Sequence, residues 1–278
     1  MNPKKKDLCN SRTAVFFLTL LLSGLLLALF PARQTQAQTA QTAAAARVRE
    51  TAEVNGVSIA YEVAGEGYPV ILIHGNGGSR KDLYTEMDQL VEAGYKVYNM
   101  DSRGQGENAP VETYHYEDMA EDVYQLIQYW GLKKPVLYGW SDGGIIGLLL
   151  EIRHPGTLGA LAGSGVNTTP DGLTDYFLQS IAFIVFFTPT SLTEMILKEP
   201  DIKEEELASI EIPVLLTAGS DDIIKEEHTR MIAETIPHAK LVILQGEDHG
   251  SYIQNSEIMG DLLIRFLGSL QLEEQPGQ

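Results

Sequence analysis

Cysteine is nearly absent from this chain, whose 278 residues include one, Cys9. A single thiol cannot form an internal disulfide, so no disulfide framework stabilises the fold. Cys9 also precedes the apolar run at 14–30, whereas a lipoprotein signal has its cysteine after such a run. Stability must therefore come from a hydrophobic core, and the chain is long enough to form one.

Positive charge is also scarce. The chain has 20 lysine and arginine residues against 38 aspartate and glutamate residues, and its formal net charge is -18. Such a charge repels nucleic acids and anionic membranes and favours solubility. We therefore expect no nucleic-acid partner, and the simplest interpretation of the acidic surface is solvation without a particular partner.

Motifs for metals and cofactors are missing as well. The histidines, the cysteine and the carboxylates show no spacing typical of metal ligands. The glycine-rich loops lack the lysine and the following helix of a phosphate-binding loop. We expect neither a metal nor a cofactor, so the chemistry must come from ordinary side chains.

The first 37 residues have the pattern of an export signal. Basic residues precede the apolar run at 14–30, which Pro31 ends, and Thr35 and Ala37 follow with the spacing that a signal peptidase recognises. We predict a signal peptide over 1–37 and an exported protein, in the periplasm, on the cell surface or outside the cell. The run also has the minimum length for an uncleaved membrane anchor, which is the alternative.

The rest of the chain is predicted to form one domain over 48–270. Residues 38–47 lack apolar periodicity and predict a disordered tether, and a flexible tail is expected over 271–278. Within the domain, strands and helices alternate, which is typical of a mostly parallel sheet with helices on both faces. The expected elements are a hairpin of strands at 48–54 and 57–63, strands at 70–73, 95–100, 135–138, 213–218 and 240–244, and helices at 80–93, 116–130, 145–152 and 226–236.

The most informative segment is 136–144. A buried strand breaks there at Ser141, which has Gly139 and Gly143 two residues away on either side, and a helix follows. Such a sharp turn forces a serine into a crowded backbone conformation and lifts its hydroxyl clear of the sheet. The pattern predicts a nucleophile elbow with Ser141 as the nucleophile.

An activated serine needs a histidine base and a carboxylate that orients the base. His249 and Asp222 both follow the ends of predicted strands, and their order after Ser141 is that of one of the known triad arrangements. We predict a triad of these three residues. Asp221 is the rival carboxylate, but Asp222 lies three residues after Gly219, as such loops usually have it.

The other histidines are expected to have structural or surface roles, because none follows a strand end within reach of Ser141. His74 lies in the turn after a strand, and His154 closes a helix. His228 and His238 are expected to be solvated.

A tetrahedral intermediate also needs hydrogen-bond donors for its oxyanion. The strand at 70–73 opens into the glycine-rich segment 74–78. The backbone N–H of Asn76 in this segment can therefore pair with that of Asp142, which follows the nucleophile. An ordinary glycine loop is the alternative.

Together these motifs resemble the α/β hydrolases over residues 48–270. The segment 74–78 resembles the oxyanion loop of that family, and 101–106 resembles its turn after the fourth strand. Ser141, Asp222 and His249 fall on its triad positions. The resemblance implies a mostly parallel, eight-stranded α/β sheet and a serine hydrolase that cleaves a small-molecule ester through an acyl-enzyme intermediate.

The elbow sequence Gly-Trp-Ser-Asp-Gly-Gly resembles the valacyclovir-hydrolase-like branch of the family, which implies small esters, including those of α-amino acids. Trp140 and Asp142, on either side of the nucleophile, are the candidate substrate-binding residues. The Asp142 carboxylate can pair with a substrate ammonium group and would repel a substrate carboxylate. The alternative is a hydrogen bond to the local backbone of the turn.

Residues 168–210 interrupt the alternation with two apolar clusters and predict a short helical cap. In α/β hydrolases an insertion at this place covers the triad, so the resemblance implies that its aromatic and aliphatic side chains wall the substrate pocket. For the run 181–187, two alternatives to lining the pocket stay open: packing in an ordinary core and contact with a membrane surface.

Several functions share the residues named above. Acyl transfer, amide hydrolysis and lactone opening use the same triad, and a non-catalytic binding module is also possible because fold alone does not establish activity. Dehalogenases and epoxide hydrolases of this fold are excluded, since they have an aspartate at the position of Ser141. The oligomeric state is left open.

Overall fold

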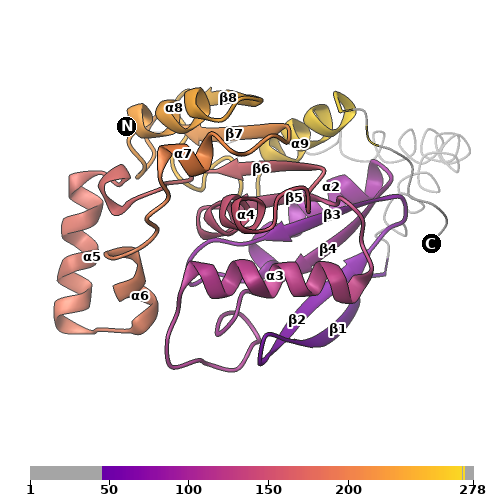
Figure 1. Cartoon of the computed structure of the whole chain (residues 1–278), viewed down its shortest axis with the longest axis horizontal. Coiled ribbons are helices and arrows are strands. Elements are labelled where there is room, and N and C mark those ends of the chain that lie inside the picture. Colours follow the sequence, from indigo (N-terminus) through magenta and orange to yellow (C-terminus); the bar gives the residue numbers. More distant parts are fainter. Residues whose placement is uncertain (1–45, 271, 273–278) are drawn as a thin grey trace, which may run out of the picture. The chain divides into compact units, whose positions relative to one another are not determined.

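The computed structural model describes residues 46–270 and 272 (Figure 1). The predicted signal peptide or anchor over 1–37, nearly all of the predicted tether and nearly all of the predicted tail lie outside the described residues. Within the described part of the chain, no helix is both long and apolar enough to cross a membrane.

The described residues form one eight-stranded sheet with the strand order β1-β2-β4-β3-β5-β6-β7-β8. The pairs β1–β2 and β2–β4 are antiparallel, and every other pair of neighbouring strands in this sheet is parallel. This mostly parallel sheet confirms the predicted fold class. The strands are β1 (Val48–Val54), β2 (Val57–Ala64), β3 (Tyr68–Ile73), β4 (Tyr95–Met100), β5 (Val136–Trp140), β6 (Ala160–Ser164), β7 (Val214–Gly219) and β8 (Ala239–Leu244).

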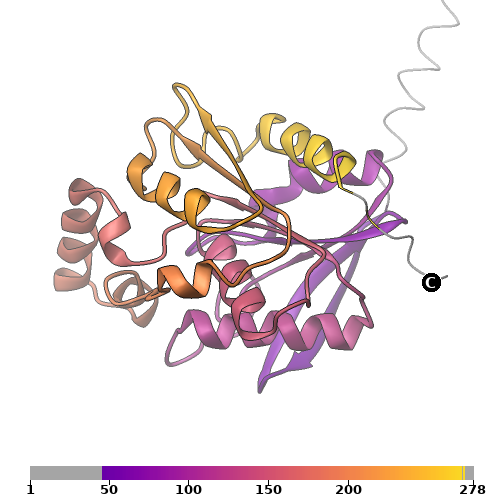
Figure 2. The ribbon, with the colours of Figure 1, turned by 45° about the horizontal axis from the view of Figure 1, so that its top comes forward.

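Helices cover both faces of the sheet, as predicted (Figures 1 and 2). Alternate residues of β3 show why: Val70 and Leu72 belong to one buried cluster, and Ile71 and Ile73 belong to the other. The sequence of a strand that is buried on both faces is an almost continuous apolar run, and residues 70–73 are all apolar. Helices α2 (Tyr84–Glu92), preceded by the short helix η1 (Arg80–Leu83), and α9 (Ile258–Gly268) pack on the first cluster, and α3 (Tyr116–Trp130), α4 (Asp142–Arg153) and α8 (Glu226–Thr235) pack on the second.

The predicted cap lies between β6 and β7. It consists of the short helix η2 (Pro170–Gly172) and of α5 (Asp175–Phe187), α6 (Ser191–Ile196) and α7 (Glu204–Leu207). Helices α5 and α6 lie side by side at one edge of the domain, at the left of Figure 1. The N–H of Ile202 donates to the carbonyl of Thr168 over 2.9 Å, so after α6 the chain returns close to where it entered the cap, and α7 follows this point.

Candidate active site

Ser141 lies at the turn from β5 to α4 with the backbone angles φ 54° and ψ -113°, a left-handed conformation that side chains rarely adopt. The crossing of strand and helix is tight. A Cβ atom on Gly139 would lie 2.0 Å from the carbonyl carbon of Gly143, and one on Gly143 would lie 2.2 Å from the carbonyl oxygen of Ile73. Only glycine fits at both positions, so these two residues shape the turn that presents the serine.

The loops after β7 and β8 bring Asp222 and His249 together. The imidazole Nδ1–H of His249 donates to Oδ1 of Asp222 over 2.6 Å. The Asp222 carboxylate is buried and also accepts the N–H groups of Ile224 (3.0 Å) and Gly219 (3.3 Å). Asp221 is exposed. Burial and backbone donors thus hold the Asp222 carboxylate, and not that of Asp221, against the imidazole.

A pocket of about 310 Å³ has both Ser141 and His249 in its wall. The apolar part of this wall comes mainly from the cap, through Leu173, Phe177, Ile181 and Ile196. The polar part, apart from the serine and the histidine, consists of Asn76, Tyr116, Asp142, Asn167, Thr193 and Glu199. The structure therefore places the predicted nucleophile and base at one small pocket beneath the cap.

The cap prediction needs a correction for the run 181–187. Ile181 lines the pocket, but Phe183, Phe186 and Phe187 are 65%, 79% and 63% exposed. Phe183, Phe186 and Phe187 lie two, five and six positions beyond Ile181. At about 100° per residue these positions lie on other sides of the helix, so this run cannot face the pocket along its whole length. The aromatic side chains at its end face away from the substrate site.

The predicted oxyanion donors lie in the same pocket wall. Among the described residues, the backbone N–H of Asn76 donates no hydrogen bond. The N–H of Asp142 belongs to the first turn of α4, where N–H groups have no intrahelical acceptor. Both donors are therefore available to a ligand, and the amino-terminal end of α4 adds a favourable field for negative charge.

The Asp142 side chain is buried and joins two elements. Its Oδ1 accepts the hydroxyl of Tyr116 over 2.7 Å, and its Oδ2 accepts the side-chain amide of Asn76 over 2.9 Å. The predicted alternative, a hydrogen bond to the local backbone of the turn, is wrong, because these partners come from α3 and from the loop after β3. Burial raises the pKa of the Asp142 carboxyl, against the lowering effect of the two donors.

Trp140 supports the histidine loop. Its indole Nε1–H donates to the carbonyl oxygen of His249 over 2.9 Å, and the two rings have centroids 5.9 Å apart. The indole also lines the pocket. Trp140 therefore contacts the pocket, as expected for a substrate-binding residue, and holds the loop of His249 as well.

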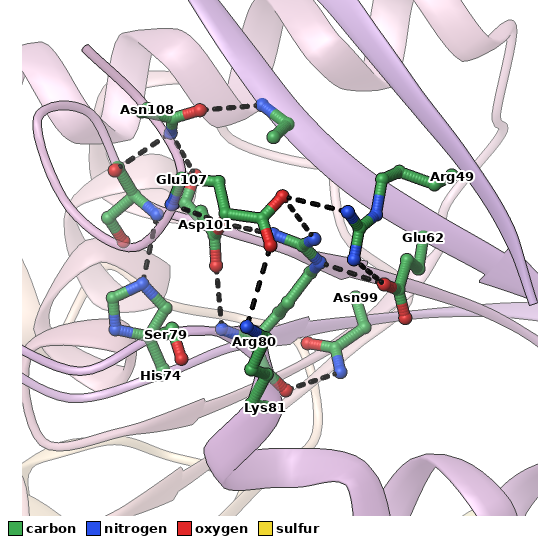
Figure 3. A network of polar contacts seen from close by, with 12 residues as sticks. Arg49, Glu62, His74, Ser79, Arg80, Lys81, Asn99, Asp101, Glu107 and Asn108 are labelled. Atoms are coloured by element: carbon green, nitrogen blue, oxygen red, sulfur yellow. Dashed lines mark hydrogen bonds and ion pairs between the residues drawn. The ribbon is translucent and has the colours of Figure 1, made fainter.

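The loop after β3 is fixed by hydrogen bonds to the turn after β4. The buried imidazole of His74 donates from Nδ1 to the carbonyl of Gly75 (2.7 Å), and its Nε2 accepts the N–H of Ser102 (3.0 Å; Figure 3). Burial lowers the pKa of His74, which keeps it neutral, as this pattern requires. The predicted structural role of His74 agrees with these contacts.

Arg80 fixes the far end of the same loop. The guanidinium is fully buried and forms ion pairs with Asp101, with Glu107 (2.9 Å) and with Glu62 (3.2 Å; Figure 3). The N–H of Arg80 also donates to Oδ1 of Asp101 over 2.7 Å. These contacts join η1, β2 and the turn at 101–106, so the predicted oxyanion loop is held by a buried ionic network.

Sequence reasoning missed four polar residues of the pocket, Tyr116, Asn167, Thr193 and Glu199, and misplaced a histidine. Glu199 accepts the backbone N–H of Tyr116 over 3.1 Å. No motif marks any of these four residues, because only tertiary contacts bring them to the pocket.

His228 is partly buried and not solvated: its Nε2 accepts the N–H of Thr168 over 3.0 Å, and burial lowers its pKa. His238 is exposed, as predicted.

Metal ligands are not grouped in the described residues: no cluster of three or more His, Cys, Asp or Glu side chains there is suited to hold a metal ion. The site consists instead of a hydroxyl, an imidazole, carboxylates and backbone donors. This set of groups can perform nucleophilic and acid–base chemistry.

Comparisons with known proteins agree with this architecture. The family model described as the alpha/beta hydrolase fold matches residues 68–192. The chain is 25% identical over 259 residues to the AB hydrolase superfamily protein YisY of Bacillus subtilis, a match that covers 77% of this chain and 96% of that protein. It is also 32% identical over 120 residues to the serine hydrolase BPHL of Homo sapiens, across 41% of each chain.

Solved structures show the same fold. A bromoperoxidase from Bacillus anthracis superimposes with a TM-score of 0.70 at 23% identity, covering 80% of this chain and 100% of that one. The esterase EaEST from Exiguobacterium antarcticum superimposes with a TM-score of 0.69 at 21% identity, covering 80% of this chain and 100% of that one. The sheet and these similarities show that the chain has the α/β-hydrolase fold, and together with the motifs they support a place among the α/β hydrolases.

Proposed function

We propose that the protein is a serine hydrolase that cleaves a small ester through an acyl-enzyme intermediate, with Ser141, His249 and Asp222 as its triad. The observation that carries the proposal is the 2.6 Å hydrogen bond from His249 to Asp222 beside a pocket that also contains Ser141. The strained backbone of Ser141 and the free N–H groups of Asn76 and Asp142 support it further.

The chemistry follows from these groups. Because Nδ1–H of His249 donates to Asp222, the other ring nitrogen, Nε2, accepts the proton of the Ser141 hydroxyl as that oxygen attacks the ester carbonyl. The backbone N–H groups of Asn76 and Asp142 stabilise the oxyanion. The protonated imidazole then gives its proton to the leaving alcohol, and a water molecule, activated by the same imidazole, releases the acid and restores the serine.

The pocket favours a small substrate that carries positive charge. Its volume of about 310 Å³ accommodates a compact acyl group. Asp142 and Glu199 place two carboxyl groups in a wall that is otherwise largely apolar, and an ammonium group would pair with either. The partial similarity to the serine hydrolase BPHL agrees with a serine hydrolase, and an ester of an α-amino acid is what the resemblance of the elbow sequence implies.

Labelling with a fluorophosphonate probe tests the proposed nucleophile, because this probe reacts with activated serines. We expect peptide mass spectrometry to find the label on Ser141 of the native chain. In the Ser141→Ala variant, we expect no label on any serine. An unlabelled Ser141 in the folded protein would favour a non-catalytic binding module.

The substrate class is tested with two esters of the same alcohol, one of alanine and one of propionate. In Asp142→Asn we expect kcat/KM for the alanine ester to fall at least about thirtyfold more than for the propionate ester, since a buried charge pair is lost. Equal losses on both esters would remove Asp142 from substrate recognition while leaving its contacts with Tyr116 and Asn76 as its role.

A further inference from the structure

Helix α5 of the cap has a bare apolar surface. Among the described residues, eight large hydrophobic side chains are exposed, and five of them belong to this one helix. We call these five residues the α5 patch. They are Tyr176, Phe183, Ile184, Phe186 and Phe187.

The patch is built from clustered aromatic rings. Tyr176 is 84% exposed and Phe186 is 79% exposed, so most of the surface of each side chain is open to solvent. The ring of Phe187 contacts Phe183, with centroids 4.6 Å apart, and Phe186, with centroids 5.0 Å apart. Single exposed apolar residues are ordinary on protein surfaces, but a contiguous group of this kind marks a surface that something covers.

The segment that contains the patch has no charged side chain, although the exposed Asp175 directly precedes it. Residues 176–193 contain no Asp, Glu, Lys or Arg, although the chain as a whole has a net charge of -18. No longer stretch without these residues occurs within 46–270. An acidic domain that exposes an uncharged aromatic surface can approach an apolar phase there without removing ionised groups from water.

The sequence also brings the domain toward such a phase. The apolar run 14–30 lies outside the described residues and has the minimum length of a membrane-spanning segment. In an uncleaved chain, the stretch 31–47 would separate it from the domain. The anchored domain would then meet a high local concentration of lipid, so even a weak second contact between domain and membrane would form. Aromatic side chains suit such a contact, because they favour the interface between water and hydrocarbon.

We propose that the α5 patch docks on the surface of an uncharged, zwitterionic lipid bilayer. The net negative charge of the chain opposes anionic lipids and therefore selects the uncharged ones. Two other residues of the same helix, Phe177 and Ile181, line the substrate pocket. Docking would consequently place the pocket beside the membrane, and it does not depend on the proposed ester chemistry.

The test uses a local reporter in the full chain, because the run 14–30 can bring every variant to vesicles. Phe186→Trp places an indole in the patch, and Tyr129→Trp places one on α3 at a side chain that is 60% exposed. Both variants are mixed with phosphatidylcholine vesicles whose acyl chains carry bromine, which quenches indole fluorescence on contact. The unsubstituted chain supplies the background from Trp130 and Trp140.

We expect quenching of the reporter at 186 and none above background at 129. Quenching should weaken with phosphatidylglycerol vesicles, and Phe183→Ser with Phe187→Ser in the reporter chain should lower the lipid affinity of the patch by about tenfold or more. No quenching at 186, equal quenching at both positions, or stronger quenching by the anionic lipid would overturn the proposal. A dimer in light scattering that Phe186→Ser abolishes would instead assign the patch to a second copy of the chain.

Discussion

Two adjacent aspartates, Asp221 and Asp222, show how a local environment selects one side chain for a role. They are chemically identical, but only Asp222 is buried, and only its carboxylate accepts backbone N–H groups and the imidazole of His249. The sequence distinguished them by their distance from Gly219, and the structure gives the physical reason.

This difference leads to a prediction for activity. Asp222→Asn should lower kcat for ester hydrolysis by about 10³–10⁴-fold, because the amide no longer fixes the imidazole tautomer or stabilises its cation. The matched variant Asp221→Asn should keep kcat within about twofold, since the Asp221 side chain is exposed. Steady-state kinetics on one activated ester measures both, and equal effects would argue against Asp222 as the orienting acid.

Glu86 is a second residue whose surroundings determine its behaviour. It lies in α2, fully buried, and neither carboxyl oxygen has a hydrogen-bond partner among the described residues. Burial raises its pKa from 4.5 to about 8. The protonated form is therefore the one that the folded protein prefers.

The sign of the pH effect follows. Below pH 4.5 the carboxyl is protonated in both states, and between 4.5 and about 8 only the unfolded chain loses the proton. The free energy of unfolding should therefore fall over this range, by at most about 1.4 kcal/mol per pH unit from this group. Glu86→Gln should flatten this fall and be more stable than the native chain at pH 8.

Urea denaturation at pH 5 and at pH 8 measures this effect. Glu92→Gln, at an exposed position of the same helix, serves as the control and should leave the difference between the two pH values unchanged. If Glu86→Gln and the native chain lose equal stability between these pH values, Glu86 is ionised in the folded protein and the expectation is wrong.

At the scale of elements, the loop after β6 lies directly against the imidazole of His249. Gly165 in this loop has a φ of 59°, and a Cβ atom there would lie 2.6 Å from Cε1 and 2.7 Å from Nδ1 of His249. The loop must therefore lack a side chain for the ring to lie against Asp222.

Gly165→Ala should displace the imidazole and lower kcat by about tenfold or more, since misplaced catalytic groups lose much of their effect. Gly156→Ala is the matched control, because Gly156 has a φ of 78° with nothing within 4 Å of the added Cβ. Both changes should cost about 1–2 kcal/mol of stability from the left-handed backbone. Comparing melting temperatures with kcat separates the loss of stability from the loss of activity. Full activity in Gly165→Ala would show that the loop moves enough to accommodate the added methyl group.

The ionic network around Arg80 connects elements in a similar way. Arg80→Met should destabilise the domain by about 3–5 kcal/mol, because it leaves buried carboxylates of Glu62 and Asp101 without their cation. Its neighbour Lys81 is 57% exposed and forms an ion pair with Glu107 at 3.5 Å, so Lys81→Met should cost less than about 0.5 kcal/mol. Chemical denaturation measures both, and similar losses would contradict a special role for the buried pair.

At the scale of the whole molecule, the parts that could be predicted were those with strong local signals. Apolar runs marked the central strands, and the Asn55–Gly56 turn, with positive φ at both residues, marked the hairpin. Ser141 and its glycines gave the elbow. The strand β6 was missed because its sequence, Ala-Leu-Ala-Gly-Ser, has no β-branched or aromatic residue.

Roles that depend on distant contacts could not be predicted in the same way. Asp142 was expected either to meet the substrate or to bond its own turn, yet its partners are Asn76 and Tyr116, which lie 66 and 26 residues away in the sequence. The partial burial of His228 depends in the same way on Thr168, 60 residues away. Periodicity reports which side of an element is buried, but it does not report what lies against it.

The hydrogen bond from Ile202 to Thr168 has an evolutionary consequence. Because the two ends of the intervening segment meet, this segment can lengthen, shorten or be exchanged for another while the sheet and the loops that bear Ser141, Asp222 and His249 stay unchanged. Replacement of this one segment is therefore a route by which descendants of this protein acquire new specificities. A chimaera that carries a foreign segment between Thr168 and Ile202 should fold with the same sheet and loops.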